Sequence, residues 1–76
     1  MHPYRADIVV FGPDARPQLL VEVKNRSAAS PEWAAQLRRN LAVHFGLTST
    51  PYFLLALPDI FYFWRNAEGD QPRQGW

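Results

Sequence analysis

Three ionisable side chains suited to holding a metal ion occur on two predicted β-strands near the start of the chain. Asp7 lies in the apolar run 5–11, and Glu22 and Lys24 lie at the end of the run 18–24. Because side chains alternate between the two faces of a strand, Glu22 and Lys24 share a face. If the two runs pair antiparallel, one register sets Asp7 opposite Glu22. Two carboxylates and a lysine would then gather at one end of an otherwise apolar face.

Such a cluster predicts a magnesium or manganese site that cleaves phosphodiester bonds. Two carboxylates about 4 Å apart repel each other unless a cation lies between them. Mg²⁺ prefers hard oxygen ligands, so we expect Asp7 and Glu22 to bind it together with the backbone carbonyl of Val23. The ion would polarise a phosphodiester oxygen and activate a bound water, and Lys24 would hold that water or balance charge on the phosphate.

The residues between the two runs support their antiparallel pairing. Residues 12–14 are Gly-Pro-Asp, which is a strong turn signal. The same register sets Val9 opposite Leu20 and Phe11 opposite Gln18. The two runs therefore predict a β-hairpin.

A helix is expected after the hairpin. Ser30 suits the N-cap, Pro31 the first helical position and Glu32 the first turn, where a carboxylate interacts favourably with the helix dipole. Arg38 and Arg39 lie on the outer face of this helix. They are candidates for contact with nucleic-acid phosphates, although a solvated helix face explains them equally well.

Two further apolar runs complete the expected fold. The run 52–57 is continuously apolar, which predicts a strand covered on both faces, and 60–64 predicts another strand. The aromatic residues of both runs are expected in the core or in a dimer interface. The order strand, strand, helix, strand, strand predicts an α/β domain with a small mixed sheet, and the polar, glycine-containing segment 65–76 is expected to be a loose C-terminal tail.

These features resemble the PD-(D/E)XK nuclease superfamily, which includes restriction endonucleases, junction resolvases and RecB-type nucleases. Its signature is an acidic residue on one strand followed, after a hairpin, by Glu or Asp, any residue, and Lys on the next strand. Asp7 and Glu22-Val23-Lys24 match it, with alanine before Asp7 in place of proline. The resemblance covers residues 5–64, and it implies a restriction endonuclease-like core that cuts DNA with Mg²⁺.

Two departures from the family pattern accompany this resemblance. The RecB-like and type I restriction branches place Gln-x-x-x-Tyr on the helix, facing the metal. Gln36 fits the first position, where the resemblance implies that it orients substrate or water, whereas Asn40 replaces the tyrosine. Family members also begin with a helix that has no counterpart before Arg5. Arg5 neighbours Lys24 in the proposed register and is a third candidate for a phosphate contact.

Other functions remain open from the sequence. The chain could be a catalytically inactive module of the same fold that binds nucleic acid or a protein partner. It could also be a small structural dimerisation domain, in which Glu22 and Lys24 are an ordinary exposed pair on a half-solvated strand. Metal binding and DNA cleavage would separate these possibilities from a nuclease.

Composition limits the class of protein. The 76 residues suffice for one small domain, and 47% hydrophobic residues are too many for a disordered chain. Cysteine is absent, which excludes disulfides and thiolate metal sites, and no apolar run approaches the roughly 20 residues of a membrane span. We therefore expect a soluble cytoplasmic protein without membrane contact. The surplus of apolar residues and the missing first helix predict a homodimer.

Overall fold

The computed structural model describes residues 6–45, 50–69 and 71–76. Its elements follow the order expected from the sequence and add a fifth strand, so the molecule is a small mixed α/β fold. The elements are β1 (Ile8–Phe11), β2 (Pro17–Val23), α1 (Pro31–Phe45), β3 (Tyr52–Ala56), β4 (Phe61–Arg65), the 3-10 helix η2 (Asn66–Glu68) and β5 (Arg73–Gly75).

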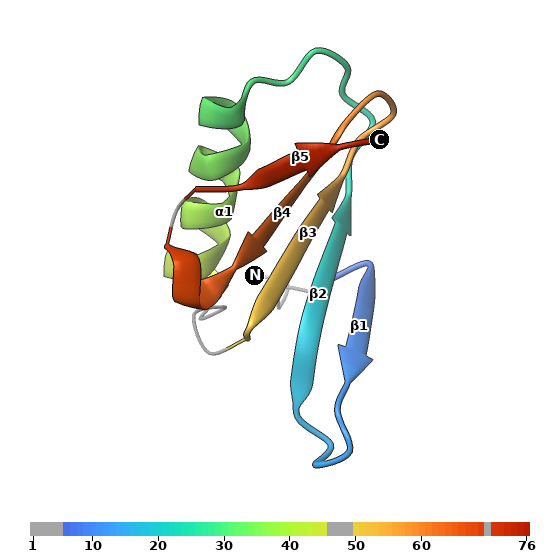
Figure 1. The fold of residues 1–76 in the computed structure, drawn as a ribbon, viewed down its shortest axis with the longest axis vertical. Helices are drawn as coiled ribbons and strands as arrows, with labels where there is room; N and C mark the ends of the chain where they lie inside the picture. Colours follow the sequence, from blue (N-terminus) through green and yellow to red (C-terminus); the bar gives the residue numbers. More distant parts are fainter. Residues whose placement is uncertain (1–5, 46–49, 70) are drawn as a thin grey trace.

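The five strands form one sheet in the order β1-β2-β3-β4-β5 (Figure 1). Only β2 and β3 run parallel, and the other three neighbouring pairs are antiparallel. A parallel pair needs a long crossover connection, and α1 lies in that connection. The hairpin of β1 and β2 extends beyond the rest of the sheet at the bottom of the view.

The β1–β2 register agrees with the expectation over most of the hairpin. Val9 pairs with Leu20 as predicted, but Phe11 pairs with Pro17 instead of Gln18. A bulge between Val10 and Phe11 accounts for the difference, because it opposes two residues of one strand to one residue of the other. The bulge lies beside the turn and leaves the register at the other end of β1 unchanged.

One face of the sheet packs against α1 and forms the core. Strand side chains on this face alternate with more exposed ones, as in a sheet covered on one side. The buried apolar residues of this core are Leu20, Ala29, Ala34, Phe53, Leu55, Leu57, Tyr62 and Trp64, and Val21 is also buried, on the opposite face of the sheet. The expectation that the run 52–57 is covered on both faces is therefore wrong: Tyr52, Leu54 and Ala56 are only half-buried.

The helix begins as predicted, and its apolar residues Trp33, Leu37 and Leu41 pack against the core. The Trp33 amide donates a hydrogen bond to Ser30 Oγ at 3.1 Å, which is an N-cap bond. Ala34 is fully buried, and Arg38, expected on the outer face, is half-buried with its guanidinium carbon 5.6 Å from the centre of the Trp64 ring. A small residue at position 34 lets the helix approach the sheet there, which turns Arg38 toward Trp64.

The expectation of a loose tail over residues 65–76 is also wrong. Residue 65 ends β4, η2 follows it, and β5 pairs antiparallel with β4. The Trp76 indole N–H donates to the Leu57 carbonyl at 3.0 Å, and its ring meets Phe61 edge-on. Gly75 makes room for the Phe61 ring, because a Cβ at that position would lie 2.9 Å from it. Backbone pairing with β4 orders a segment that has no apolar periodicity of its own.

Candidate functional site

Asp7 lies immediately before β1 and is held against the end of β2. Its Oδ2 accepts a hydrogen bond from the Val23 amide at 2.7 Å. Ile8 pairs with Val21, so the same register places position 7 opposite Glu22. The carboxylate of Asp7 is exposed and lies at the peptide group that joins Glu22 to Val23.

Glu22 is the only buried charged residue in the described part of the chain, with 7% of its surface exposed. It belongs to the helix-covered face, in the same row as Leu55 and Tyr62 on β3 and β4. Its Oε1 lies 3.3 Å from Lys24 Nζ, an ion pair in which the lysine side chain is 46% exposed. The Lys24 amide also donates to the Ala56 carbonyl at 3.1 Å, which continues the β2–β3 pairing past the end of the strand.

The structure thus brings Asp7, Glu22 and Lys24 together at one end of β2. Glu22 and Lys24 are two residues apart on an extended backbone, so their side chains point the same way. Asp7 reaches the same end from the neighbouring strand. An open pocket adjoins this end of the sheet and is lined by Val23, Lys24, Asn25, Ala56, Leu57 and Pro58.

The helix residues proposed for the site lie elsewhere. Gln36 is exposed and sits about 200° around the helix from the fully buried Ala34, on the side that faces away from the sheet. Its amide donates to Asn40 Oδ1 at 3.0 Å and accepts from Arg39 at 3.0 Å. Arg38 packs over Trp64 in the core. Arg5 lies outside the described residues.

The donors at the end of β2 fit a hard divalent cation. Asp7 and Glu22 supply carboxylates and Val23 supplies a backbone carbonyl, and Mg²⁺ is commonly held by one or two carboxylates with water completing its shell. The described residues contain no group of three or more His, Cys, Asp or Glu side chains able to hold a metal. The set therefore suits an oxygen-ligated ion that keeps several waters, and it does not suit zinc.

Two hydrogen bonds that sequence reasoning missed position the loop after Lys24. The buried Tyr62 hydroxyl donates to the Ala29 carbonyl at 2.6 Å, and Asp59 Oδ2 accepts from the Ala28 amide at 2.9 Å. Burial raises the pKa of Tyr62 above its usual 10.0, and the nearby Asp59 and Glu32 carboxylates raise it further. The sequence placed Tyr62 only in the apolar run 60–64, a pattern that indicates no long-range polar contact.

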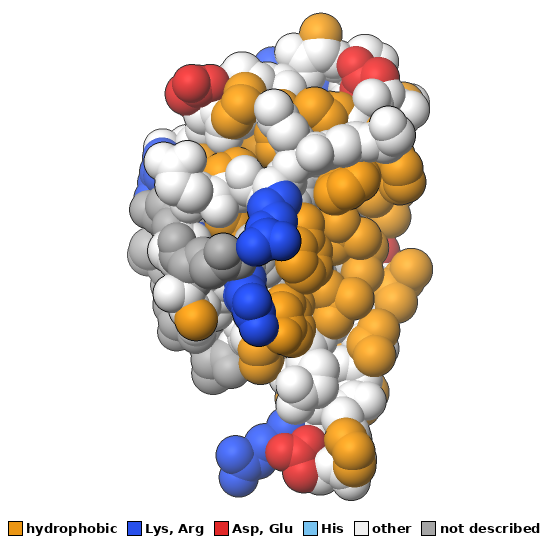
Figure 2. Space-filling view, in the orientation of Figure 1, with side chains coloured by type: hydrophobic (Ala, Val, Ile, Leu, Met, Phe, Trp, Pro, Cys, Tyr) orange, Lys and Arg blue, Asp and Glu red, His pale blue; other side chains and the backbone are white. Residues whose placement is uncertain are grey.

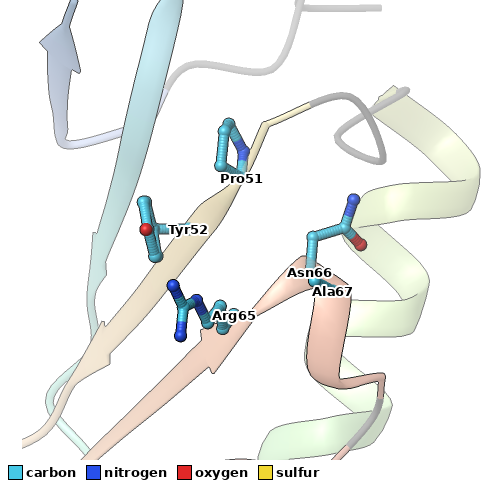
Figure 3. Close-up of a pocket in the computed structure, with 5 residues that line it drawn as sticks. All are labelled: Pro51, Tyr52, Arg65, Asn66 and Ala67. Atoms are coloured by element: carbon cyan, nitrogen blue, oxygen red, sulfur yellow. The ribbon is translucent and has the colours of Figure 1, made fainter.

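A second pocket lies on the other face of the sheet. Figure 3 shows its lining residues, which are Pro51, Tyr52, Arg65, Asn66 and Ala67. The Arg65 guanidinium carbon is 6.0 Å from the centre of the Tyr52 ring. Tyr52 and Arg65 pair across β3 and β4 on the face away from α1. This pocket is therefore separate from the carboxylate cluster.

Comparison of the chain with family models, with curated proteins and with solved structures finds no match. The assignment of a function therefore depends on the geometry of the chain itself. Within the described residues, no helix has the length and apolar character needed to cross a membrane.

Proposed function

We propose that this chain is a metal-dependent nuclease module with a restriction endonuclease-like core, and that it hydrolyses phosphodiester bonds in DNA. One observation carries the proposal: the Asp7 carboxylate is fixed on the Val23 amide beside a buried Glu22 that is paired with Lys24. Two carboxylates and an ammonium group from neighbouring strands lie at the end of the sheet, and Lys24 also lines an adjoining open pocket.

The burial of Glu22 supports a functional role for the cluster. Removing a carboxylate from water is costly unless it is paired, and a buried ion pair is often no more stabilising than apolar residues of the same size. The rest of the helix-covered face is apolar, so a leucine at position 22 would serve the core at least as well. A glutamate at this position, with its carboxylate directed to Lys24, therefore favours a functional role over a role in packing the core.

Each residue has a role in this proposal. Asp7, Glu22 and the Val23 carbonyl hold Mg²⁺ or Mn²⁺, which supplies Lewis-acid stabilisation of the phosphate and lowers the pKa of its bound water. Lys24 orients a water molecule or stabilises charge on the phosphate, and its half-exposed ammonium group can reach a substrate in the pocket. Gln36 has no part in the proposal, because its side chain bonds to Asn40 and Arg39 on the outer side of α1.

The test is a cleavage assay on duplex, single-stranded and branched DNA with Mg²⁺ or Mn²⁺. Asp7→Ala and Lys24→Ala should each lower the cleavage rate by about 100-fold or more, the range expected for loss of a catalytic group. Asp14→Ala is the matched control, because it removes another exposed carboxylate, at the turn between β1 and β2. Activity that survives both site substitutions would exclude this mechanism.

A catalytically inactive module that binds nucleic acid or a protein partner is the second candidate. It is favoured by the ion pair of Glu22 with Lys24 and the bond of Asp7 to the Val23 amide, which together give both carboxylates a partner without a metal. Titration with Mn²⁺ separates the two candidates. Heat of binding at millimolar metal that disappears in Asp7→Ala supports the nuclease. A folded chain without such heat supports the inactive module.

A further inference from the structure

The face of the sheet away from α1 carries a broad apolar surface, which we call the open face. It consists of the alternate strand residues that do not enter the core. These are Ile8 and Val10 of β1, Leu19 and Val23 of β2, Tyr52, Leu54 and Ala56 of β3, and Phe61 and Phe63 of β4; Val21 of β2 lies on the same face but is buried. Figure 2 shows hydrophobic side chains running across the strands, with basic side chains along one margin. The one α-helix that the structure describes packs on the opposite face.

Among the described residues, the most exposed large apolar side chains lie on or beside this face. Ile8 is 53% exposed, Val10 46%, Phe11 60%, Val23 54% and Trp76 74%. Since an aromatic side chain such as Phe11 or Trp76 has roughly 150 to 250 Å² of surface and the three aliphatic side chains have less, these five expose on the order of 500 Å². The half-buried residues between them enlarge the patch. The total approaches the roughly 800 Å² that each partner contributes to a standard protein interface.

The composition of the open face favours a protein partner. Three of the five most exposed apolar residues on or beside it, Ile8, Val10 and Val23, are aliphatic, whereas surfaces that bind single-stranded nucleic acid rely on aromatic rings to stack the bases. The described strand positions on this face include no acidic residue. Their charged residues are Arg65 and Arg73, at the β4–β5 side.

We propose that a second copy of this chain covers the open face, so that the protein is a homodimer built by packing one sheet on another. A two-fold axis parallel to the strands and lying between the sheets places β1 of one copy over β4 and β5 of the other. The exposed aliphatic residues of β1 then cover the aromatic residues of the partner's β4. The arginines on β4 and β5 of one copy lie opposite β1 of the other, on opposite sides of the contact, so the arginines of the two copies do not oppose each other.

This dimer does not rest on the proposed nuclease function. Glu22 and Lys24 lie on the helix-covered face, outside the contact, whereas Val23 and Ala56, which line the pocket beside them, lie on the open face and are covered by the second copy. A chain that binds no metal and cleaves no DNA would still dimerise, and a monomer could still carry the metal site. The mass measurement therefore tests the dimer alone, and the cleavage assay tests the nuclease alone.

Sedimentation equilibrium and light scattering test the proposal. At micromolar concentration the wild-type chain should have twice the 8.8 kDa mass of one copy. Val10→Lys should raise the dimer Kd at least tenfold, because it puts a charge into the apolar contact between β1 of one copy and β4 of the other. Gln74→Lys is the matched control, since Gln74 is exposed and lies in the row of Glu22 and Tyr62 on the other face. Its Kd should not change.

Val23→Lys is a second interface variant, at a residue of β2 that is already exposed. It provides the same test if Val10→Lys does not fold, which far-ultraviolet circular dichroism would reveal. A wild-type chain that remains monomeric at these concentrations overturns the proposal, whether or not the open face then binds an oligonucleotide or another protein. A dimer whose Kd is unaffected by a folded interface variant also overturns it.

Discussion

Removal of the Tyr62 hydroxyl tests the tertiary contact that fixes the loop between the candidate site and α1. This hydroxyl donates to the Ala29 carbonyl at 2.6 Å, and the two residues are only 1% and 6% exposed. Tyr62→Phe keeps the ring in the core and leaves the carbonyl without this donor. A buried hydrogen bond contributes about 0.5 to 1.5 kcal/mol net, and an unsatisfied buried group costs about 1 to 3 kcal/mol.

We therefore expect Tyr62→Phe to lower the free energy of unfolding by about 1.5 kcal/mol, which is roughly 6 to 12 °C in Tm for a domain of this size. Urea unfolding followed by tryptophan emission measures it, at fixed protein concentration because dimerisation would make stability concentration-dependent. Tyr52→Phe is the control. The Tyr52 hydroxyl has no hydrogen-bond partner among the described residues, so its loss should cost less than about 0.5 kcal/mol.

The pH dependence gives a second result from the same variant. The pKa of Tyr62 is raised in the folded state by burial, so its contribution to stability is complete below the unfolded pKa of 10.0 and is lost as pH rises through the folded pKa. The stability difference between wild type and Tyr62→Phe should therefore shrink in strongly alkaline buffer. Equal stabilities of the two proteins at neutral pH, or a difference that grows with alkalinity, would refute the reasoning.

Three further predictions follow from single contacts. Ser30→Ala removes the N-cap bond to the Trp33 amide and should cost about 1 kcal/mol in urea unfolding, while Ser27→Ala, in the preceding loop, should cost much less. Lys24→Met removes the ammonium partner of Glu22 and should lower the free energy of unfolding by about 1 kcal/mol, since the lysine is half-exposed. Adding Glu22→Gln to this variant should restore part of that stability. A double-mutant cycle in which the two effects simply add would contradict the pairing. Hydrogen exchange should show protected amides in β5, whereas exchange of residues 73–75 at the rate of an unstructured peptide would contradict the fifth strand.

The local pattern of the sequence was sufficient for most of the elements. The alternation of side chains identified β1 and β2 and their register at Val9, and the cap residues located the start of α1 at Pro31. The same alternation placed Glu22 and Lys24 on one face, because two residues on an extended chain always point the same way. These features depend on near neighbours in the chain.

Other features depended on contacts between distant residues. The bulge at Phe11 follows from how the turn closes, and the partial burial of Arg38 follows from its packing over Trp64. The strand β5 exists because β4 offers it a hydrogen-bonding edge, which no local pattern predicts.

The candidate site divides in the same way. The sequence by itself determined which residues could meet. The spacing of Glu22 and Lys24 puts both side chains on one face of β2, and the hairpin register puts Asp7 opposite Glu22. Only the tertiary structure decided that Glu22 is buried, that the Asp7 carboxylate binds the Val23 amide, and that Gln36 turns away. The burial of Glu22 and the orientation of Gln36 arise from packing between elements far apart in the chain. The face of a strand on which a side chain lies is a property of the extended backbone alone.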